Sequence, residues 1–260
     1  MIVDSHVHVG RWKYPPLDEY RAAMLEAGVS HAVLVQFVGN ADNSYLSQCV
    51  AADPARFTAI AMVEDDTPGA IDHVARLAAT SHFTGVRLWA ATRSPGSDPL
   101  ALWRAIAGHG LVASVRGPLA DIAHPAFAEV VDELPELRLR LEHAGFTRYP
   151  DAAVDRRDFD RFLALASRPR VYTMWAGFYA NSGTAYPYPD ADPFLREIVA
   201  AYGARRITWS GDWNRPDPLA RSYPDAIRHV TDRSYLSDED RVWILGGAAR
   251  ELFGWPVEAS

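Results

Sequence analysis

Two histidines close to the start of the chain are spaced for chemistry. His6 and His8 follow the apolar residues 1–3, which read as the start of a buried strand. Residues two apart in a strand project to the same face, so both imidazoles can reach one metal ion or one substrate from the strand end. A His-x-His pair can equally consist of one turn cap and one solvated side chain. The rest of the chain has to decide between these interpretations.

Further polar residues end other apolar runs, and their types suit a binding or catalytic site. Arg87, Arg116, His143 and Asp212 each close such a run. Imidazole nitrogens and a carboxylate oxygen form a ligand set suited to zinc or a similar divalent ion. Arginine offers a planar fork of N–H donors that matches a carboxylate, so both arginines could hold an acidic group or a lactone carbonyl of a substrate. The alternative for each arginine is a structural ion pair.

Short apolar runs alternate with amphipathic stretches along the whole chain, which is typical of repeated βα units. The predicted strands are 1–7, 31–37, 57–63, 84–90, 111–117, 137–143, 171–177 and 207–212. The helices predicted between them include 17–28, 68–80, 99–110, 124–135 and 192–203. Eight such units predict an α/β fold, a single (β/α)8 TIM barrel over residues 1–260. The site is then expected at the C-terminal ends of the strands, where the polar residues lie.

Composition limits the classes of partner. The chain has 260 residues, a net charge of −7 and no cluster of Lys and Arg, which argues against a nucleic-acid or anionic-membrane partner and favours a small-molecule substrate. No apolar run approaches the roughly 18 residues of a membrane span. The single cysteine, Cys49, excludes an intramolecular disulfide and a thiolate-rich zinc site, and fits a cytoplasmic location. A homo-oligomer is compatible with the sequence.

The segments DSHVHVG, LEHAG, TWSGDWNRP and LGGAARELFGW resemble the amidohydrolase superfamily, and their order is similar to the branch of sugar-lactone and 2-pyrone-4,6-dicarboxylate lactone hydrolases. The resemblance implies that Asp212 is the general base that activates water. His6, His8 and His143 would either bind one divalent metal ion, zinc or manganese, together with Asp212, or donate hydrogen bonds to the developing oxyanion without a metal. No lysine or glutamate resembling a bridging ligand ends a strand, so a two-metal centre is not expected. The candidate catalytic residues are Asp212, His143 and Arg116.

Aromatic residues gather near the predicted mouth and favour an unsaturated or aromatic ring over a polyhydroxylated sugar. The candidate substrate-binding residues are Arg87, Trp89, Trp175, Tyr179 and Trp213, with Arg215 as a weaker candidate. The segment 178–193 is too long for a tight turn, and its Gly, Pro and Tyr content predicts an ordered lid rather than a helix.

Three classes of function remain at this point. The first is hydrolysis of a lactone or related cyclic ester. The second is metal-dependent decarboxylation of an aromatic or unsaturated acid, which would be expected to need one more histidine at a neighbouring strand end. The third is a binding protein without catalysis, against which the set of His6, His8, His143 and Asp212 argues.

Overall fold

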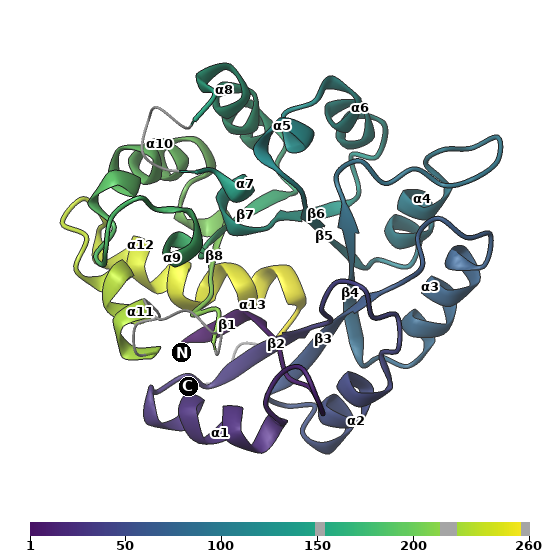
Figure 1. Cartoon of the computed structure of the whole chain (residues 1–260), viewed down its shortest axis with the longest axis horizontal. Coiled ribbons are helices and arrows are strands. Elements are labelled where there is room, and N and C mark those ends of the chain that lie inside the picture. The colour runs from purple at the N-terminus through teal and green to yellow at the C-terminus, as the bar shows by residue number, and fades with distance from the viewer. Residues whose placement is uncertain (149–153, 214–222, 256–260) are drawn as a thin grey trace.

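The computed structural model describes residues 1–148, 154–213 and 223–255, and within them it confirms the predicted barrel. Eight parallel strands follow one another in sequence order around a nearly closed barrel (Figure 1). The strands are β1 (Val3–Val7), β2 (His31–Val35), β3 (Phe57–Met62), β4 (Phe83–Trp89), β5 (Val112–Arg116), β6 (Arg138–Leu141), β7 (Val171–Trp175) and β8 (Ile207–Trp209). Every predicted strand is therefore present.

Helices surround the barrel and cover its outer face (Figure 1). The predicted helices are present as α1 (Leu17–Glu26), α3 (Ala70–Ala79), α4 (Ala101–Gly108), α6 (Pro125–Glu133) and α10 (Asp192–Tyr202). The others are α2 (Ser44–Ala52), α5 (Leu119–Ile122), α7 (His143–Phe146), α8 (Arg156–Ala164), α9 (Phe178–Asn181), α11 (Tyr223–Thr231), α12 (Asp238–Val242) and α13 (Ala248–Phe253). The 3₁₀ turns are η2 (Leu165–Ser167), η3 (Pro189–Ala191) and η4 (Ala204–Arg206), and η5 (Trp243–Gly247) is a π-helical turn.

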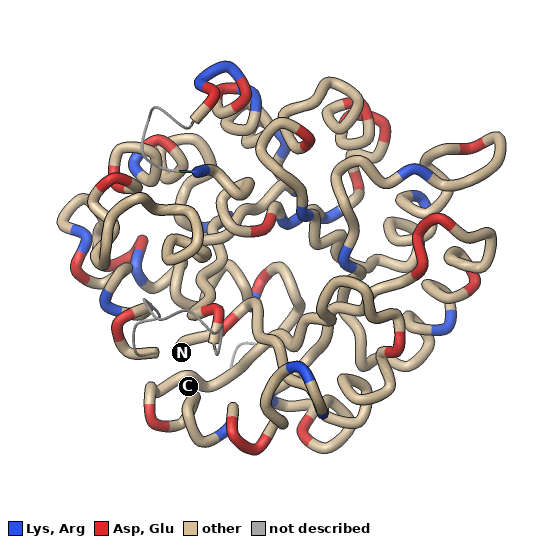
Figure 2. The backbone as a smooth tube through the Cα atoms, viewed as in Figure 1, with Lys and Arg blue, Asp and Glu red and all other residues tan. Residues whose placement is uncertain are grey.

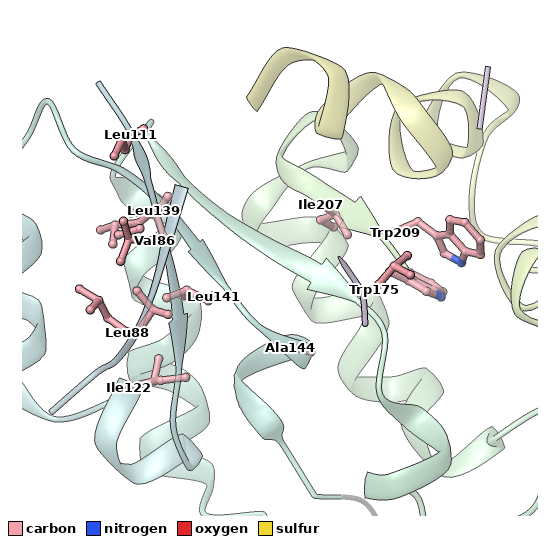
Figure 3. Packing of buried hydrophobic residues seen from close by; sticks show 14 of the residues in the cluster. Val86, Leu88, Leu111, Ile122, Leu139, Leu141, Ala144, Trp175, Ile207 and Trp209 are labelled. Carbon is pink, nitrogen blue, oxygen red and sulfur yellow. The ribbon is translucent and has the colours of Figure 1, made fainter. Parts of the chain in front are cut away.

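Alternation along the strands divides the apolar side chains into two buried clusters. Figure 3 shows part of the larger cluster, which includes Leu88, Leu141 and Trp175 and packs the strands against the helices. The smaller cluster combines residues of five strands, Val3 among them, with Leu252 and Phe253 of α13. Because these strands surround a common interior, α13 closes the N-terminal end of the barrel. The opposite end is left for the site.

The segment after β7 corrects one expectation. Residues 178–193 were expected to form a lid without helix, but Phe178–Asn181 form the helical turn α9 and Pro189–Ala191 form η3. Gly177, with φ 84°, turns the chain sharply after the strand, which allows a helical turn to start at once.

The remaining sequence features behave as simple packing predicts. Cys49 is buried on α2. In the described part of the chain, no helix is both long enough and apolar enough to cross a membrane. Lys and Arg are interspersed with Asp and Glu around the ring of helices (Figure 2).

Candidate active site

The two histidines of β1 lie together at the mouth of the barrel. The Nε2 atoms of His6 and His8 are 3.3 Å apart, and the rings meet edge to face. His8 Nδ1 lies 2.7 Å from the carbonyl oxygen of Val35, which can only accept, so Nδ1 donates and Nε2 keeps its lone pair. The neighbouring strand therefore fixes the orientation of His8 with its lone pair in the pocket.

His143 and Asp212 complete the group, and both have a strained backbone. Their φ angles are 48°, in the left-handed region that costs a non-glycine residue roughly 1–2 kcal/mol. Strain of this kind is found where a side chain has to be aimed, and here it turns both side chains toward His6. One ligand atom each from His6, His143 and Asp212 lie within 4.8 Å of one another, and all three residues are buried.

The donor set fits a single divalent ion. His143 Nδ1 is buried and has no hydrogen-bond partner among the described residues, which is costly unless a further group occupies the space before it. Burial lowers the pKa of His6 and of His143, and it lowers the pKa of His8 to about 3. The imidazoles are therefore neutral at pH 7, the form in which they can bind a metal ion.

A buried ionic network supports this group from inside the barrel. Glu142 lies between Arg87 and Arg140. Burial alone would raise the pKa of Glu142, but the charge and hydrogen bonds of Arg87 outweigh it and bring the pKa to about 2. Arg140 also lies 3.4 Å from Nδ1 of His6. The network therefore holds the back of the His6 ring.

Arg87 uses its guanidinium for this network. It donates three hydrogen bonds to Glu142 and one to the backbone oxygen of Gln36, although its side chain also borders the pocket. The structural ion pair, which was the alternative to substrate binding, is thus the arrangement found for Arg87.

A pocket of about 220 Å³ opens in front of the histidines. It is lined by His8, Lys13, Tyr14, Phe37, Val38, Arg87, Arg116, His143, Phe146 and Asp212. The guanidinium of Arg116 lies over the ring of Trp89, 4.1 Å from its centre. Trp89 is not among the lining residues, so it contributes to the pocket by supporting Arg116.

The remaining candidates occupy different positions. Tyr179 donates a hydrogen bond to Oδ2 of Asp212, so α9 reaches the candidate base directly. Trp213 packs on Tyr20, outside the residues that line the pocket. Arg215 lies outside the described residues.

The placement of Trp175 differs from the prediction that it binds substrate. It is 1% exposed and lies next to Trp209 on the outer face of the barrel (Figure 3). Its indole N–H donates to Nδ1 of His229 on α11 at 2.9 Å. The reason is that side chains alternate between the two faces of a strand. Met174 of β7 therefore points into the barrel, and Trp175, the next residue, points outward to the helices.

Sequence analysis missed Lys13, the only lysine of the chain, as a lining residue. Its ammonium lies 4.5 Å from the centre of the Phe37 ring, in a cation–π contact that draws it toward the pocket. Lys13 is five residues beyond His8, in the loop that must cross the mouth between β1 and α1. Its position in a βα loop was the signal that could have identified it.

Buried histidines and an aspartate thus lie together at the C-terminal strand ends of a (β/α)8 barrel, which is where barrel enzymes have their active sites. Residues 3–255 match the amidohydrolase family model, and the chain belongs to this family. The L-fucono-1,5-lactonase of Burkholderia ambifaria is 24% identical over an alignment of 285 positions, which covers 96% of this chain and 94% of the relative. These matches confirm the resemblance to the lactonase-like branch.

Solved structures confirm the fold. A Pseudomonas putida protein named as a candidate 2-pyrone-4,6-dicarboxylic acid hydrolase has a TM-score of 0.82 at 26% identity, covering 99% of this chain and 98% of that one. An amidohydrolase from Burkholderia multivorans with bound zinc has a TM-score of 0.77 at 20% identity, covering 98% of this chain and 100% of that one. The protein is thus an amidohydrolase-type enzyme.

Proposed function

We propose that the protein hydrolyses a lactone or related cyclic ester, with Asp212 as the general base. The observation that carries this proposal is the convergence of the Asp212 carboxylate with His6 and His143, because Asp212 and His143 line one pocket and His6 lies directly behind them. A carboxylate in that position can take a proton from water while neighbouring imidazoles face the carbonyl under attack. The names of the lactonase and the lactone-hydrolase relatives support the same reaction class.

The reaction needs two proton transfers, and one residue can perform both. Asp212 removes a proton from water, whose oxygen then attacks the ring carbonyl and forms a tetrahedral oxyanion. The oxyanion collapses by breaking the bond to the ring oxygen, and Asp212 returns the proton to that oxygen. The product is one open-chain hydroxy acid. Tyr179 holds Oδ2 of Asp212, which leaves Oδ1 to face the water.

The same residues would hold a metal cofactor. His6, His143 and Asp212 would bind one zinc or manganese ion, with His8 beside them. When bound, such an ion polarises the carbonyl and acidifies water. Without it, a hydrogen bond to the oxyanion would come from His6 or His143, because Nε2 of His8 keeps its lone pair.

The substrate is proposed to be a small molecule with an acidic group. Arg116 and Lys13 both border the pocket and carry positive charge, and Arg87, which is paired with Glu142, borders it as well. Tyr14, Phe37 and Phe146 supply flat apolar surface, which suits an unsaturated ring.

Decarboxylation of an aromatic acid is the second candidate, because an acidic ring compound would fit the same lining. It is the less supported of the two, since His8 and His143 are the only histidines among the described lining residues. No additional histidine is placed there to protonate a ring carbon.

Elemental analysis of protein purified without added metal, combined with assays on lactones and aromatic acids before and after chelation, tests this proposal. We expect about one equivalent of zinc or manganese and lactone opening that chelation abolishes. Metal-free protein that opens lactones would retain Asp212 as base and assign the histidines to hydrogen bonding. Release of CO₂ from aromatic acids, with no lactone opened, would overturn the proposal.

A further inference from the structure

The barrel has one seam at which neighbouring strands are not joined by a backbone ladder. Each strand from β1 to β7 pairs with the one that follows it, and among the described residues no ladder joins β8 to β1. At the N-terminal end, η5 and α13 pack against both strands. Figure 1 shows α13 passing beside β1 and β8. Gly246 of η5 comes so close to the carbonyl of Met1 that a side chain would not fit. The mouth end of the seam needs other contacts.

The first contact across the mouth is the carboxylate of Asp4. Its Oδ1 accepts the backbone N–H of His6 at 3.1 Å, and its Oδ2 accepts the backbone N–H of Gly211 at 3.2 Å. Tyr223 of α11 donates to Oδ2 as well. Asp4 is fully buried, so water does not compete for these bonds. One side chain thus ties His6 to the residue before Asp212.

The second contact is the hydroxyl of Ser210. Ser210 Oγ donates to the backbone oxygen of His6 at 2.9 Å and accepts the backbone N–H of Asp212 at 2.9 Å. Asp212 has the strained φ of 48°, and a bond to its N–H helps to hold that conformation. The backbone N–H of His6 is therefore linked through Asp4 to Gly211, and its backbone oxygen is linked through Ser210 to Asp212.

We propose that Asp4 and Ser210 are positioning residues that set the separation of His6 and Asp212 across the seam between β1 and β8. Elsewhere in the barrel the ladder fixes neighbouring strand ends, and here two side chains replace it. The importance of this separation rests on the proposed function, because base and imidazole must face the same substrate carbonyl. The arrangement of the backbone itself does not depend on that function.

The test compares Ser210→Ala with two controls. Ser210→Thr retains a hydroxyl and should restore the contact. Thr208→Val removes a buried hydroxyl that donates to Thr173 between β7 and β8, where a ladder is present. Crystal structures of all variants report the separation of His6 and Asp212, and chelator competition reports zinc affinity. Asp4→Asn is the second variant, because an amide cannot accept at both oxygen positions.

We expect Ser210→Ala to move Asp212 away from His6 and to weaken zinc binding about 10- to 100-fold, the usual effect of losing a residue that orients a ligand. Ser210→Thr and Thr208→Val should keep the wild-type separation and affinity. A Ser210→Ala structure that superimposes on the wild type would overturn the inference, as would equal displacement in Thr208→Val. If wild-type protein binds no zinc, the metal part of the proposed function fails, and the crystal structures still decide the role of Ser210.

Discussion

Asp212 is restrained by two hydrogen bonds and by its backbone conformation. Tyr179 donates to its carboxylate, Ser210 accepts its N–H, and its backbone has the left-handed conformation. The side chain is nevertheless at the pocket surface. Such restraint suits a base that must stay close to one water molecule.

Replacing Asp212 by Asn should lower kcat for lactone opening about 10²- to 10⁴-fold, because an amide cannot accept the proton of water. Asn tolerates the left-handed conformation, so the fold should remain. Steady-state kinetics and thermal unfolding check both statements. An unchanged kcat would remove Asp212 from the role of base.

Lys13 offers a separate test of substrate charge. Lys13→Met should raise KM for carboxylated lactones roughly 3- to 10-fold while leaving KM for their methyl esters unchanged, because only the charge interaction is lost. Arg11→Met is the matched control, since Arg11 is in the same loop but contacts Gln48 and Tyr45. Equal effects of Lys13→Met on acids and esters would indicate loss of packing against Phe37.

The turn between β7 and α9 shapes the site because Gly177 has no side chain. A Cβ atom at Gly177 would lie 2.9 Å from Nδ1 of His143, closer than such atoms approach. Gly177 also has a φ of 84°. This glycine therefore gives the chain its turn and leaves space for the imidazole.

Gly177→Ala should displace the His143 ring and lower kcat at least 10-fold. Gly254→Ala is a matched control, because Gly254 also has a left-handed backbone, with φ 79° and ψ 26°, but an added Cβ there would meet no atom within 4 Å. Both variants should lose about 1 kcal/mol of unfolding free energy from backbone strain. Kinetics and denaturant unfolding separate the two effects, and similar kcat values for both variants would contradict the role given to Gly177.

Two features of the elements could not be predicted from the sequence pattern, namely the outward orientation of Trp175 and the short helix α9. Alternation predicted all eight strands, but it did not assign each side chain to the inner or outer face. Trp175 was consequently expected at the site, although it packs against His229 outside the barrel. The short helix α9 was missed because its four residues are too few for a helical period.

For the whole molecule, buried neutral histidines should make the fold sensitive to acid. His229 accepts the indole N–H of Trp175 through Nδ1, and its Nε2 faces the carbonyl of Pro187. Burial lowers the pKa of His229 to about 3 from 6.5. Protonation would place a second donor against the indole N–H.

The free energy of unfolding should therefore fall as pH is lowered from about 6.5 toward 3, by up to about 1.4 kcal/mol per pH unit for this residue. Between pH 6.5 and pH 3 His229 is protonated in the unfolded chain but not in the folded protein. Above pH 6.5 it is neutral in both states, so its contribution to the pH dependence disappears. His229→Gln preserves an acceptor and a donor without titrating, so its stability should fall less steeply. Urea unfolding at several pH values measures this slope, and identical slopes for both proteins would refute the assignment.

Sequence patterns were enough to predict the barrel and several of the residues at its mouth. Periodicity places strands and helices because burial of one face is a local property, and strand ends of a parallel barrel share one mouth. His6, His8, His143, Asp212 and Arg116 follow from these two facts together.

The tertiary structure sets how those residues are used. In the folded protein Arg87 pairs with Glu142, and Lys13 lines the pocket. Asp4 and Ser210 form hydrogen bonds across the seam between the first and last strands. Asp4 and Gly211 are 207 positions apart in the sequence. Contacts of that kind depend on how the barrel brings the two edges of its sheet together, and local sequence patterns carry no information about which residues then meet.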